Sequence, residues 1–191
     1  MKIEIRRESI AALPQYAEIS IAFEVSEMFE VTTDSHSGQL TLAARGVAVP
    51  YTKDYDAVDG ESPLQWPRRF DVSSWAFFSA FEDDTRVGGA AVARDTPGMD
   101  MLEGRGDLAV LWDIRVAPAH RRRGVGAALF ETAVSWASAA GCDQLKVETQ
   151  NINVGACRFY ARHGCMLRAA RRGMYPRFAD EIQLLWYASI S

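Results

Sequence analysis

A cluster of arginines and glycines carries the clearest chemistry in this sequence. Residues 121–129 read Arg-Arg-Arg-Gly-Val-Gly-Ala-Ala-Leu, between a strand-like apolar run ending at Val116 and a long helix-like run. Gly124 and Gly126 lack a Cβ, so the backbone can turn tightly and bring its N–H groups against a ligand. The first turn of the following helix adds unpaired N–H donors and the positive end of its dipole. The segment predicts a cradle for a pyrophosphate; taken alone, it also fits a surface arginine run before an ordinary helix.

Composition limits the classes of protein to consider. The chain has 191 residues, of which 48% are hydrophobic, and this suits one globular domain with a core of its own. The net charge of −4 gives no global attraction to nucleic acid or to an anionic membrane. The clustered arginines therefore indicate a local anionic ligand.

Cysteine and histidine usage indicates the compartment and argues against a metal. The three cysteines, Cys142, Cys157 and Cys165, form no even framework, which favours reduced thiols and a cytoplasmic location. The three histidines have no cysteine or carboxylate neighbours at ligand spacing, so we expect no metal. The N-terminus alternates apolar and charged residues, and we expect neither a signal peptide nor a membrane-spanning segment.

Periodicity and turn residues predict the order of the elements. A short strand begins the chain, and a segment from Ser9 through Phe29 has the mixed periodicity of one or two helices. Further on we expect strands at 39–49, 108–116, 145–149, 166–174 and 182–187, a hairpin at 75–93, helices ending at Gly141 and Gly164, and a long loop at 50–67. This order predicts an α/β protein of the α+β type, with a mixed sheet flanked by helices.

Two motifs in sequence give the chain a family resemblance. The pattern Arg121-x-x-Gly124-x-Gly126 follows a strand, and Asn153-Val-Gly-Ala-Cys-Arg-Phe-Tyr160 follows about one strand-helix unit later. Together they resemble the paired signatures of the GCN5-related N-acetyltransferase (GNAT) superfamily. The resemblance implies a single N-acetyltransferase domain over 1–191, with a twisted mixed sheet and a V-shaped cleft for the cosubstrate acetyl-CoA. Residues 1–70 would form the N-terminal part with the substrate loop, and 108–187 the acetyl-CoA-binding and catalytic part.

A closer resemblance rests on three segments. Residues 148–160, 50–55 and 181–187 look like the corresponding parts of streptothricin acetyltransferases. This implies acetylation of the β-lysine amine of streptothricin, a small cationic molecule, with antibiotic resistance as the result; it also allows a homodimer. Two alternatives stay open: an N-acetyltransferase for another small amine, a polyamine or a protein N-terminus, and an acyl-CoA-binding sensor without turnover.

The resemblance also assigns coenzyme-binding residues. The first motif would hold the pyrophosphate of acetyl-CoA, and the second would support the pantetheine arm and thioester. A backbone N–H near Val116 would stabilise an oxyanion, and Asn153 would contact pantetheine or simply cap a helix. The full set is Ile114, Val116, Arg121, Arg122, Arg123, Gly124, Val125, Gly126, Ala127, Asn153, Ala156 and Tyr160.

Acetyl transfer to an amine needs a proton acceptor and a proton donor. An ammonium of pKa near ~10.4 is almost entirely protonated at neutral pH, so a carboxylate or a water chain ending on one must take its proton. Asp113 and Glu148 are the two candidates, although Asp113 equally fits a partner of Arg115, and Glu148 a solvated strand residue. By resemblance Tyr160 would protonate the leaving thiolate; its alternative role is core packing.

Substrate contacts are expected in the loop that follows residue 50. Tyr51, Asp54 and Tyr55, with Glu148, offer carboxylates and aromatic faces to ammonium groups. The alternative is a solvated acidic loop. Tyr175 and Trp112 fit either a pocket wall or the core.

Overall fold

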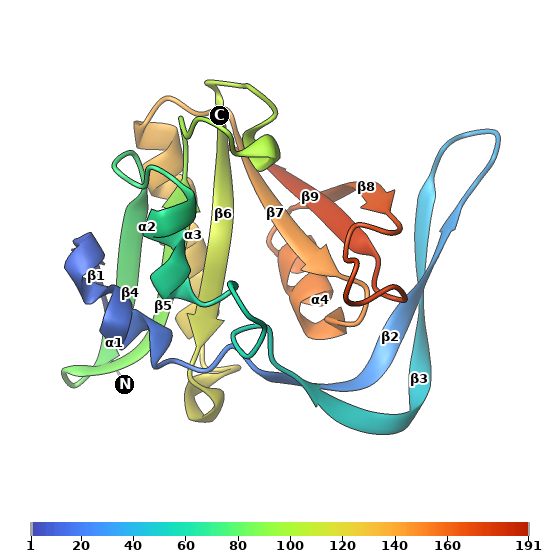
Figure 1. Cartoon of the computed structure of the whole chain (residues 1–191), viewed down its shortest axis with the longest axis horizontal. Coiled ribbons are helices and arrows are strands. Elements are labelled where there is room, and N and C mark those ends of the chain that lie inside the picture. Colours follow the sequence, from blue (N-terminus) through green and yellow to red (C-terminus); the bar gives the residue numbers. More distant parts are fainter. Residues whose placement is uncertain (1, 191) are drawn as a thin grey trace. The chain divides into compact units, whose positions relative to one another are not determined.

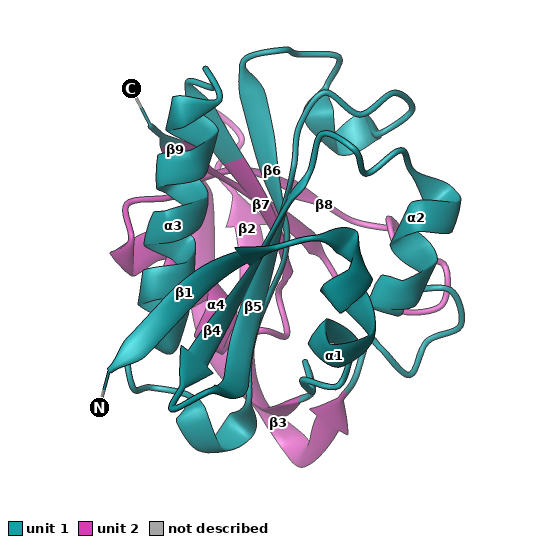
Figure 2. Ribbon diagram, turned by 90° about the vertical axis from the view of Figure 1, so that its left-hand side faces the viewer, with its two compact units in different colours: residues 1–22, 54–145, 189–191 teal, residues 23–53, 146–188 magenta. Residues whose placement is uncertain are grey.

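The computed structural model describes residues 2–190, which divide into two compact units (Figure 2). Among these described residues, unit 1 contains 2–22, 54–145 and 189–190, and unit 2 contains 23–53 and 146–188. Figure 1 labels the helices and strands along the chain. No helix of the described chain is long and apolar enough to cross a membrane.

Unit 1 is built on four antiparallel strands in the order β1-β4-β5-β6. Their bounds are β1 Ile3–Glu8, β4 Ala76–Glu82, β5 Thr85–Ala93 and β6 Leu108–Val116. The expected hairpin is confirmed, since β4 and β5 are joined by Asp83 and Asp84, both in the left-handed region (φ 47° and 63°). Aspartate tolerates this conformation better than most residues, which explains the tight turn.

Helices cover both faces of these strands (Figure 2). Helix α3 (Val125–Ala139) packs on one face, and α1 (Leu13–Ala17) and α2 (Trp66–Arg69) lie on the other. Adjacent glycines on β5 show how close the two layers come. A Cβ on Gly88 would lie 3.1 Å from Leu129 of α3, and a Cβ on Gly89 would collide with the ring of Tyr16 of α1.

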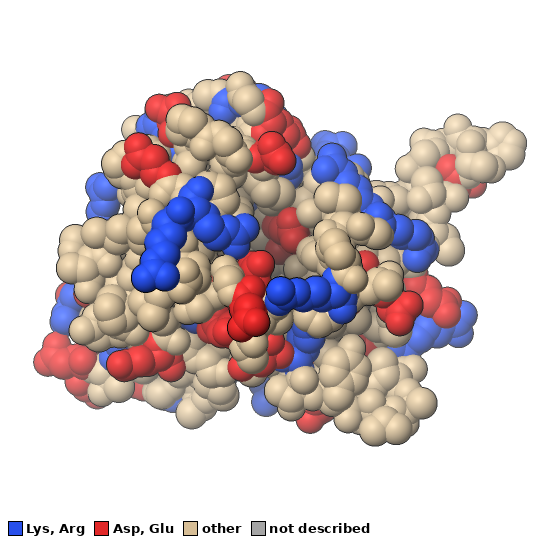
Figure 3. Space-filling model, viewed as in Figure 1, with Lys and Arg blue, Asp and Glu red and all other residues tan. Residues whose placement is uncertain are grey.

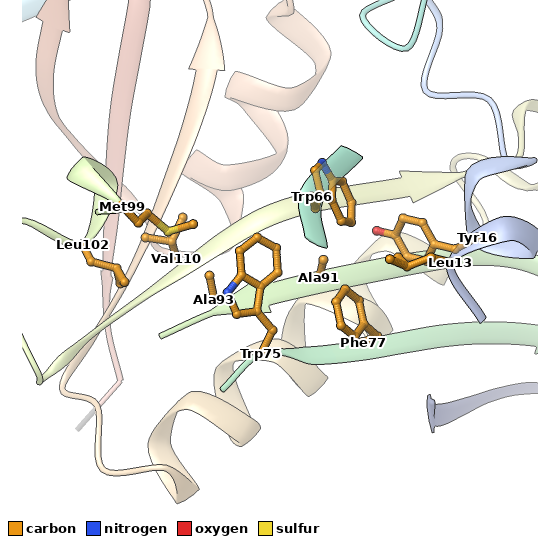
Figure 4. Close-up of a cluster of buried hydrophobic side chains, with 10 residues drawn as sticks. All are labelled: Leu13, Tyr16, Trp66, Trp75, Phe77, Ala91, Ala93, Met99, Leu102 and Val110. Atoms are coloured by element: carbon orange, nitrogen blue, oxygen red, sulfur yellow. The ribbon is translucent and has the colours of Figure 1, made fainter. Parts of the chain in front are cut away.

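An aromatic cluster fills the face that carries α1 and α2 (Figure 4). Trp66 stacks on Phe77 with ring centroids 6.5 Å apart, and Trp75 lies 6.1 Å from Trp66. Tyr16 meets Trp66 edge to face at 5.8 Å. These buried rings fix α1 and α2 on the strands, because large apolar surfaces leave water together.

Unit 2 contains two groups of strands. A two-stranded ribbon pairs β2 (Phe23–Thr33) with β3 (Leu40–Lys53), and β9 (Gln183–Ser189) lies between β7 (Gln144–Gln150) and β8 (Met166–Arg171). Helix α4 (Val154–Arg162) follows β7. Asn151 attaches the ribbon to this unit, since its Nδ2 donates to the carbonyl of Phe29 at 3.1 Å.

Two expectations about the elements were wrong. The expected helices up to Phe29 end at Ala17, and Phe23–Thr33 is strand β2 instead. The reason is its pairing with β3, a partner that local periodicity does not reveal. Strand β3 also runs beyond Val49 to Lys53, so Pro50 and Tyr51 lie in a strand, where Tyr51 pairs with Val25. The positions of the other expected strands and helices are confirmed to within a few residues.

Candidate active site

The glycine turn of unit 1 has the backbone geometry of an anion cradle. Gly124 is the N-cap of α3 with φ 87°, and Arg122 also lies in the left-handed region with φ 59°. No side chain caps α3, and no acidic residue stands in its first turn. The N–H groups of Val125, Gly126 and Ala127 lie in the first turn of α3, before the bond from the N–H of Ala128 to the carbonyl of Gly124. The first four N–H groups of an α-helix have no acceptor within the helix itself, and an anion satisfies them well.

The three arginines of the turn have different roles. Arg121 is tied to backbone, with Nε donating to the carbonyl of Val116 at 2.9 Å, and burial lowers its pKa. Arg123 pairs with Glu82 at 3.2 Å. Arg122 is exposed, and it makes no ion pair among residues 2–190. Arg122 is therefore the arginine most available to a phosphate.

A buried ion pair occupies Asp113 on β6. The guanidinium of Arg115 donates to it from Nε at 2.8 Å and from Nη2 at 2.7 Å, and the hydroxyl of Tyr16 donates at 2.5 Å. Arg115 also donates to Asp56 at 2.7 Å and to the carbonyl of Ile19 at 3.0 Å. The Arg115 side chain is only 1% exposed. This network anchors the loop after β3 and the segment after α1 to β6.

The charges explain the pKa shifts in that network. Burial, reinforced by the negative charge of Asp113, raises the pKa of Tyr16 well above its ordinary value. Burial alone would lower the pKa of Arg115, but the adjacent Asp113 more than offsets it and the pKa is raised. Burial raises the pKa of Asp56, partly opposed by Arg115. The other expected acid of this loop, Asp54, accepts the N–H of Asp56 at 3.0 Å.

Glu148 of unit 2 has neutral partners only. Tyr175, between β8 and β9, donates its hydroxyl hydrogen to Oε1 of Glu148 at 2.6 Å. Gln183 of β9 donates from Nε2 to Oε2 at 2.7 Å. Glu148 is half-buried and has no ion pair in this unit. Both of its carboxylate oxygens are therefore held by hydrogen bonds, whereas the sequence also allowed a solvated strand residue.

Helix α4 carries the second motif. Oδ1 of Asn153 accepts the N–H of Ala156 at 3.1 Å, so Asn153 caps the helix and the Ala156 donor is already used. Tyr160 is 4% exposed, and its ring meets Phe159 edge to face. Cys157 on the same helix is buried, and burial raises the pKa of its thiol to about 11. A protonated thiol is a poor nucleophile, which disfavours an acetyl-cysteine route.

A second ionic contact fixes the segment between β8 and β9. Lys53, at the end of β3, pairs with Glu181 at 2.5 Å, and both side chains are at most 10% exposed. Its Nζ also lies 3.0 Å from the ring centroid of Phe178. Tyr51 on the same strand is 46% exposed, and its pKa is raised, first by partial burial and then by the charge of Glu181.

The predicted residues fall into both units. Unit 1 holds Asp113, Ile114, Val116, the turn 121–127, Asp54 and Tyr55; unit 2 holds Tyr51, Glu148, Asn153, Ala156 and Tyr160. Sequence reasoning missed Tyr16, the partner of Asp113 in unit 1, and Gln183, a partner of Glu148 in unit 2. Tyr175 was weighed only as a pocket wall or a core residue. These contacts join residues far apart in the chain, so no local motif marks them.

Neither a large charged patch on the face drawn in Figure 3 nor a metal-binding group marks the described residues. On the face drawn in Figure 3, acidic and basic side chains lie in small mixed groups, and neither sign covers that face. Among residues 2–190 no group of three or more His, Cys, Asp and Glu side chains is placed to hold a metal ion.

The fold and the glycine turn define the class of protein. The model of the acetyltransferase (GNAT) family matches residues 44–165, more than half of the chain. The chain belongs to the GNAT acetyltransferase family, and it is an acyltransferase that uses acetyl-CoA. The expected fold, a mixed sheet flanked by helices, is confirmed.

More particular similarity comes from individual relatives. Streptothricin acetyltransferase A of Bacillus subtilis is 29% identical over 153 residues, which cover 79% of this chain and 80% of that protein. A streptothricin acetyltransferase of Escherichia coli is 30% identical over 190 residues, covering 98% and 95%. The crystal structure of nourseothricin acetyltransferase matches with a TM-score of 0.76 at 25% identity, covering 100% of both chains.

Proposed function

We propose that this protein acetylates an amine of streptothricin, on its β-lysine moiety, and so protects a cell that contains it. The observation that carries the proposal is the 30% identity to a streptothricin acetyltransferase over almost the whole of both chains. Two further relatives with the same activity in their names support it. The substrate is then a small polycation, and the acetyl group passes to it directly.

The unit 1 turn suits the diphosphate of the cosubstrate. When bound, acetyl-CoA supplies an acetyl group activated as a thioester, so that a C–N bond forms and a C–S bond breaks. The N–H groups of Val125, Gly126 and Ala127 would hold phosphate oxygens, because they lie in the first turn of α3, which has no side-chain cap and no acidic residue. The exposed guanidinium of Arg122 would add a positive charge beside them.

Glu148 would take the proton of the substrate ammonium. An ammonium of pKa near ~10.4 must lose a proton before its nitrogen has a lone pair to react with. A carboxylate draws in the cation and accepts that proton. Glu148 is favoured over Asp113 because its partners are neutral, whereas Asp113 is already neutralised by Arg115.

Two tyrosines would serve the leaving group and the cation. The hydroxyl of Tyr160 would give its proton to the departing thiolate, whose intrinsic pKa near ~8.5 makes such help useful. The half-exposed ring of Tyr51 would lie against an ammonium group of the polycation.

Val116, next to the turn, would contribute a backbone N–H to the acetyl oxygen.

Thiol release from acetyl-CoA tests the proposal. We expect purified protein to release CoA thiol with streptothricin at a kcat/KM far above that for spermidine, lysine amide or a short peptide. A sensitive bacterium expressing the protein should grow on streptothricin. A higher kcat/KM for one of the other amines than for streptothricin would make that amine the substrate instead. Acetyl-CoA binding without thiol release from any amine would favour an acyl-CoA sensor.

A further inference from the structure

Glu148 differs in its partners from the other buried or half-buried carboxylates of unit 2. Glu27 pairs with Arg158 at 2.5 Å, and Glu181 pairs with the buried Lys53. Only Glu148, among the carboxylates of this unit that are not exposed, has no cationic partner. Removing a negative charge from water costs free energy unless a positive charge or hydrogen bonds compensate it. This position therefore favours a cation that comes from outside the chain.

Two neutral donors hold the carboxylate of Glu148 in one orientation. Each carboxylate oxygen accepts one hydrogen bond, from Tyr175 and from Gln183, and each retains a free lone pair. Neither donor carries a positive charge. The geometry of Glu148 therefore leaves room for an ammonium as a further partner.

The direction of the Tyr175 hydroxyl is set by a third residue. Nε2 of Gln150 donates to the hydroxyl oxygen of Tyr175 at 3.2 Å, which leaves the hydroxyl hydrogen for Glu148. Burial, together with the charge of Glu148, raises the pKa of Tyr175, so the phenol keeps its proton. The segment that carries Tyr175 is held by the pair Lys53 and Glu181.

Gln183 contributes an independent indication of a ligand. Gln183 as a whole residue is only 7% exposed. Its Oε1 is buried and has no hydrogen-bond partner in the described chain. Buried acceptors are nearly always satisfied, and an orphan is expensive. An ammonium carries several N–H donors, enough for Oε1 of Gln183 and a free lone pair of Glu148 together.

We propose that Glu148, Tyr175 and Gln183 form an ammonium subsite. Tyr175 is a positioning residue that sets the direction of Glu148, and Gln183 both holds Glu148 through Nε2 and offers Oε1 to the ammonium. The inference rests on the proposed function, in which the substrate is a protonated amine. It adds the residues that select a cation over a neutral group. In the transfer itself the ammonium proton moves to Glu148, and the freed nitrogen lone pair forms the C–N bond while the C–S bond of the thioester breaks and CoA leaves as the thiolate.

Steady-state kinetics with streptothricin tests the subsite. We expect Tyr175→Phe and Gln183→Met to raise KM for streptothricin about tenfold or more, since each removes a hydrogen bond to a charged group. KM for acetyl-CoA should not change. In both variants kcat should change less than KM for streptothricin, because the subsite contributes to binding of the cation. Tyr187→Phe, which removes a hydroxyl elsewhere on β9, is the matched control.

Other outcomes would overturn either the subsite or the proposed function. Variants that lower the melting temperature, or that raise both KM values alike, would reduce these residues to a structural role and overturn the subsite. Calorimetric titration of streptothricin separates the two proposals. Wild-type protein that binds streptothricin without acetylating it would refute the function, while weaker binding by both variants would still support the subsite. Equal binding by wild type and variants would refute the subsite.

Discussion

Arg115 and Asp113 stand two residues apart on β6, and their side chains form a bidentate ion pair with N–O distances of 2.8 and 2.7 Å. Residues at this spacing project to the same face of a strand, so the pair is local. Tyr16 and Asp56 complete it from outside the strand. Glu148 has no such cation. The two carboxylates that the sequence presents as equal candidates therefore have different surroundings.

Substituting each carboxylate by its amide should separate stability from catalysis. Asp113→Asn removes one of the two carboxylate charges that compensate buried Arg115, and we expect a loss of about 3 kcal/mol in the free energy of unfolding. Glu148→Gln leaves no buried cation unpaired, so its melting temperature should change little while kcat/KM falls by about 10² to 10⁴. Urea titration and thiol release measure the two effects. If Asp113→Asn were stable but inactive while Glu148→Gln stayed active, Asp113 and not Glu148 would be the proton acceptor.

Features set by neighbouring residues could be predicted from the sequence. Gly124 marks the start of α3 and Asn153 the start of α4, because each is a cap whose conformation or side chain acts on the next turn. The β4–β5 hairpin is equally local, since its turn residues lie between the paired strands. The anion cradle is predictable for the same reason: its donors belong to consecutive residues.

Features set by distant residues could not be predicted. Segment 23–33 has apolar residues at both strand-like and helix-like spacings, and only its pairing with β3 decides the outcome. The site partners behave alike: Arg115 meets Asp56 across 59 positions, and Tyr175 meets Glu148 across 27. Residue type indicates that such carboxylates need partners, but which ones they meet depends on the fold.

Tyr160→Phe should slow the chemical step while leaving coenzyme binding intact. The ring stays, so packing of the buried side chain is preserved, but the hydroxyl that would protonate the thiolate is lost. We expect kcat to fall at least about tenfold. Calorimetry should give the same Kd for acetyl-CoA as wild type. An unchanged kcat would remove Tyr160 from the mechanism.

Arg122→Ala should weaken acetyl-CoA binding more than Arg123→Ala. Arg122 has no ion pair in the described chain, whereas Arg123 is paired with Glu82. A lost charged contact to phosphate should raise KM for acetyl-CoA several-fold, and the effect should shrink as salt screens the charge. Kinetics at low and high ionic strength measure both. Equal KM values for the two variants would place the phosphates away from Arg122.

Gly89→Ala should destabilise unit 1 through the aromatic layer. A Cβ at this position would collide with the ring of Tyr16, and it would lie 3.1 Å from the carbonyl oxygen of Phe78. Displacing Tyr16 would break its hydrogen bond to Asp113, so one methyl group should cost about 1–3 kcal/mol, as overpacking does. The matched control is Gly106→Ala, because a Cβ there meets nothing within 4 Å and its φ needs no glycine. Urea unfolding measures both variants. Equal stability of the two proteins would mean that the Tyr16 ring can shift without loss, and that its bond to Asp113 contributes little to holding the Arg115 network.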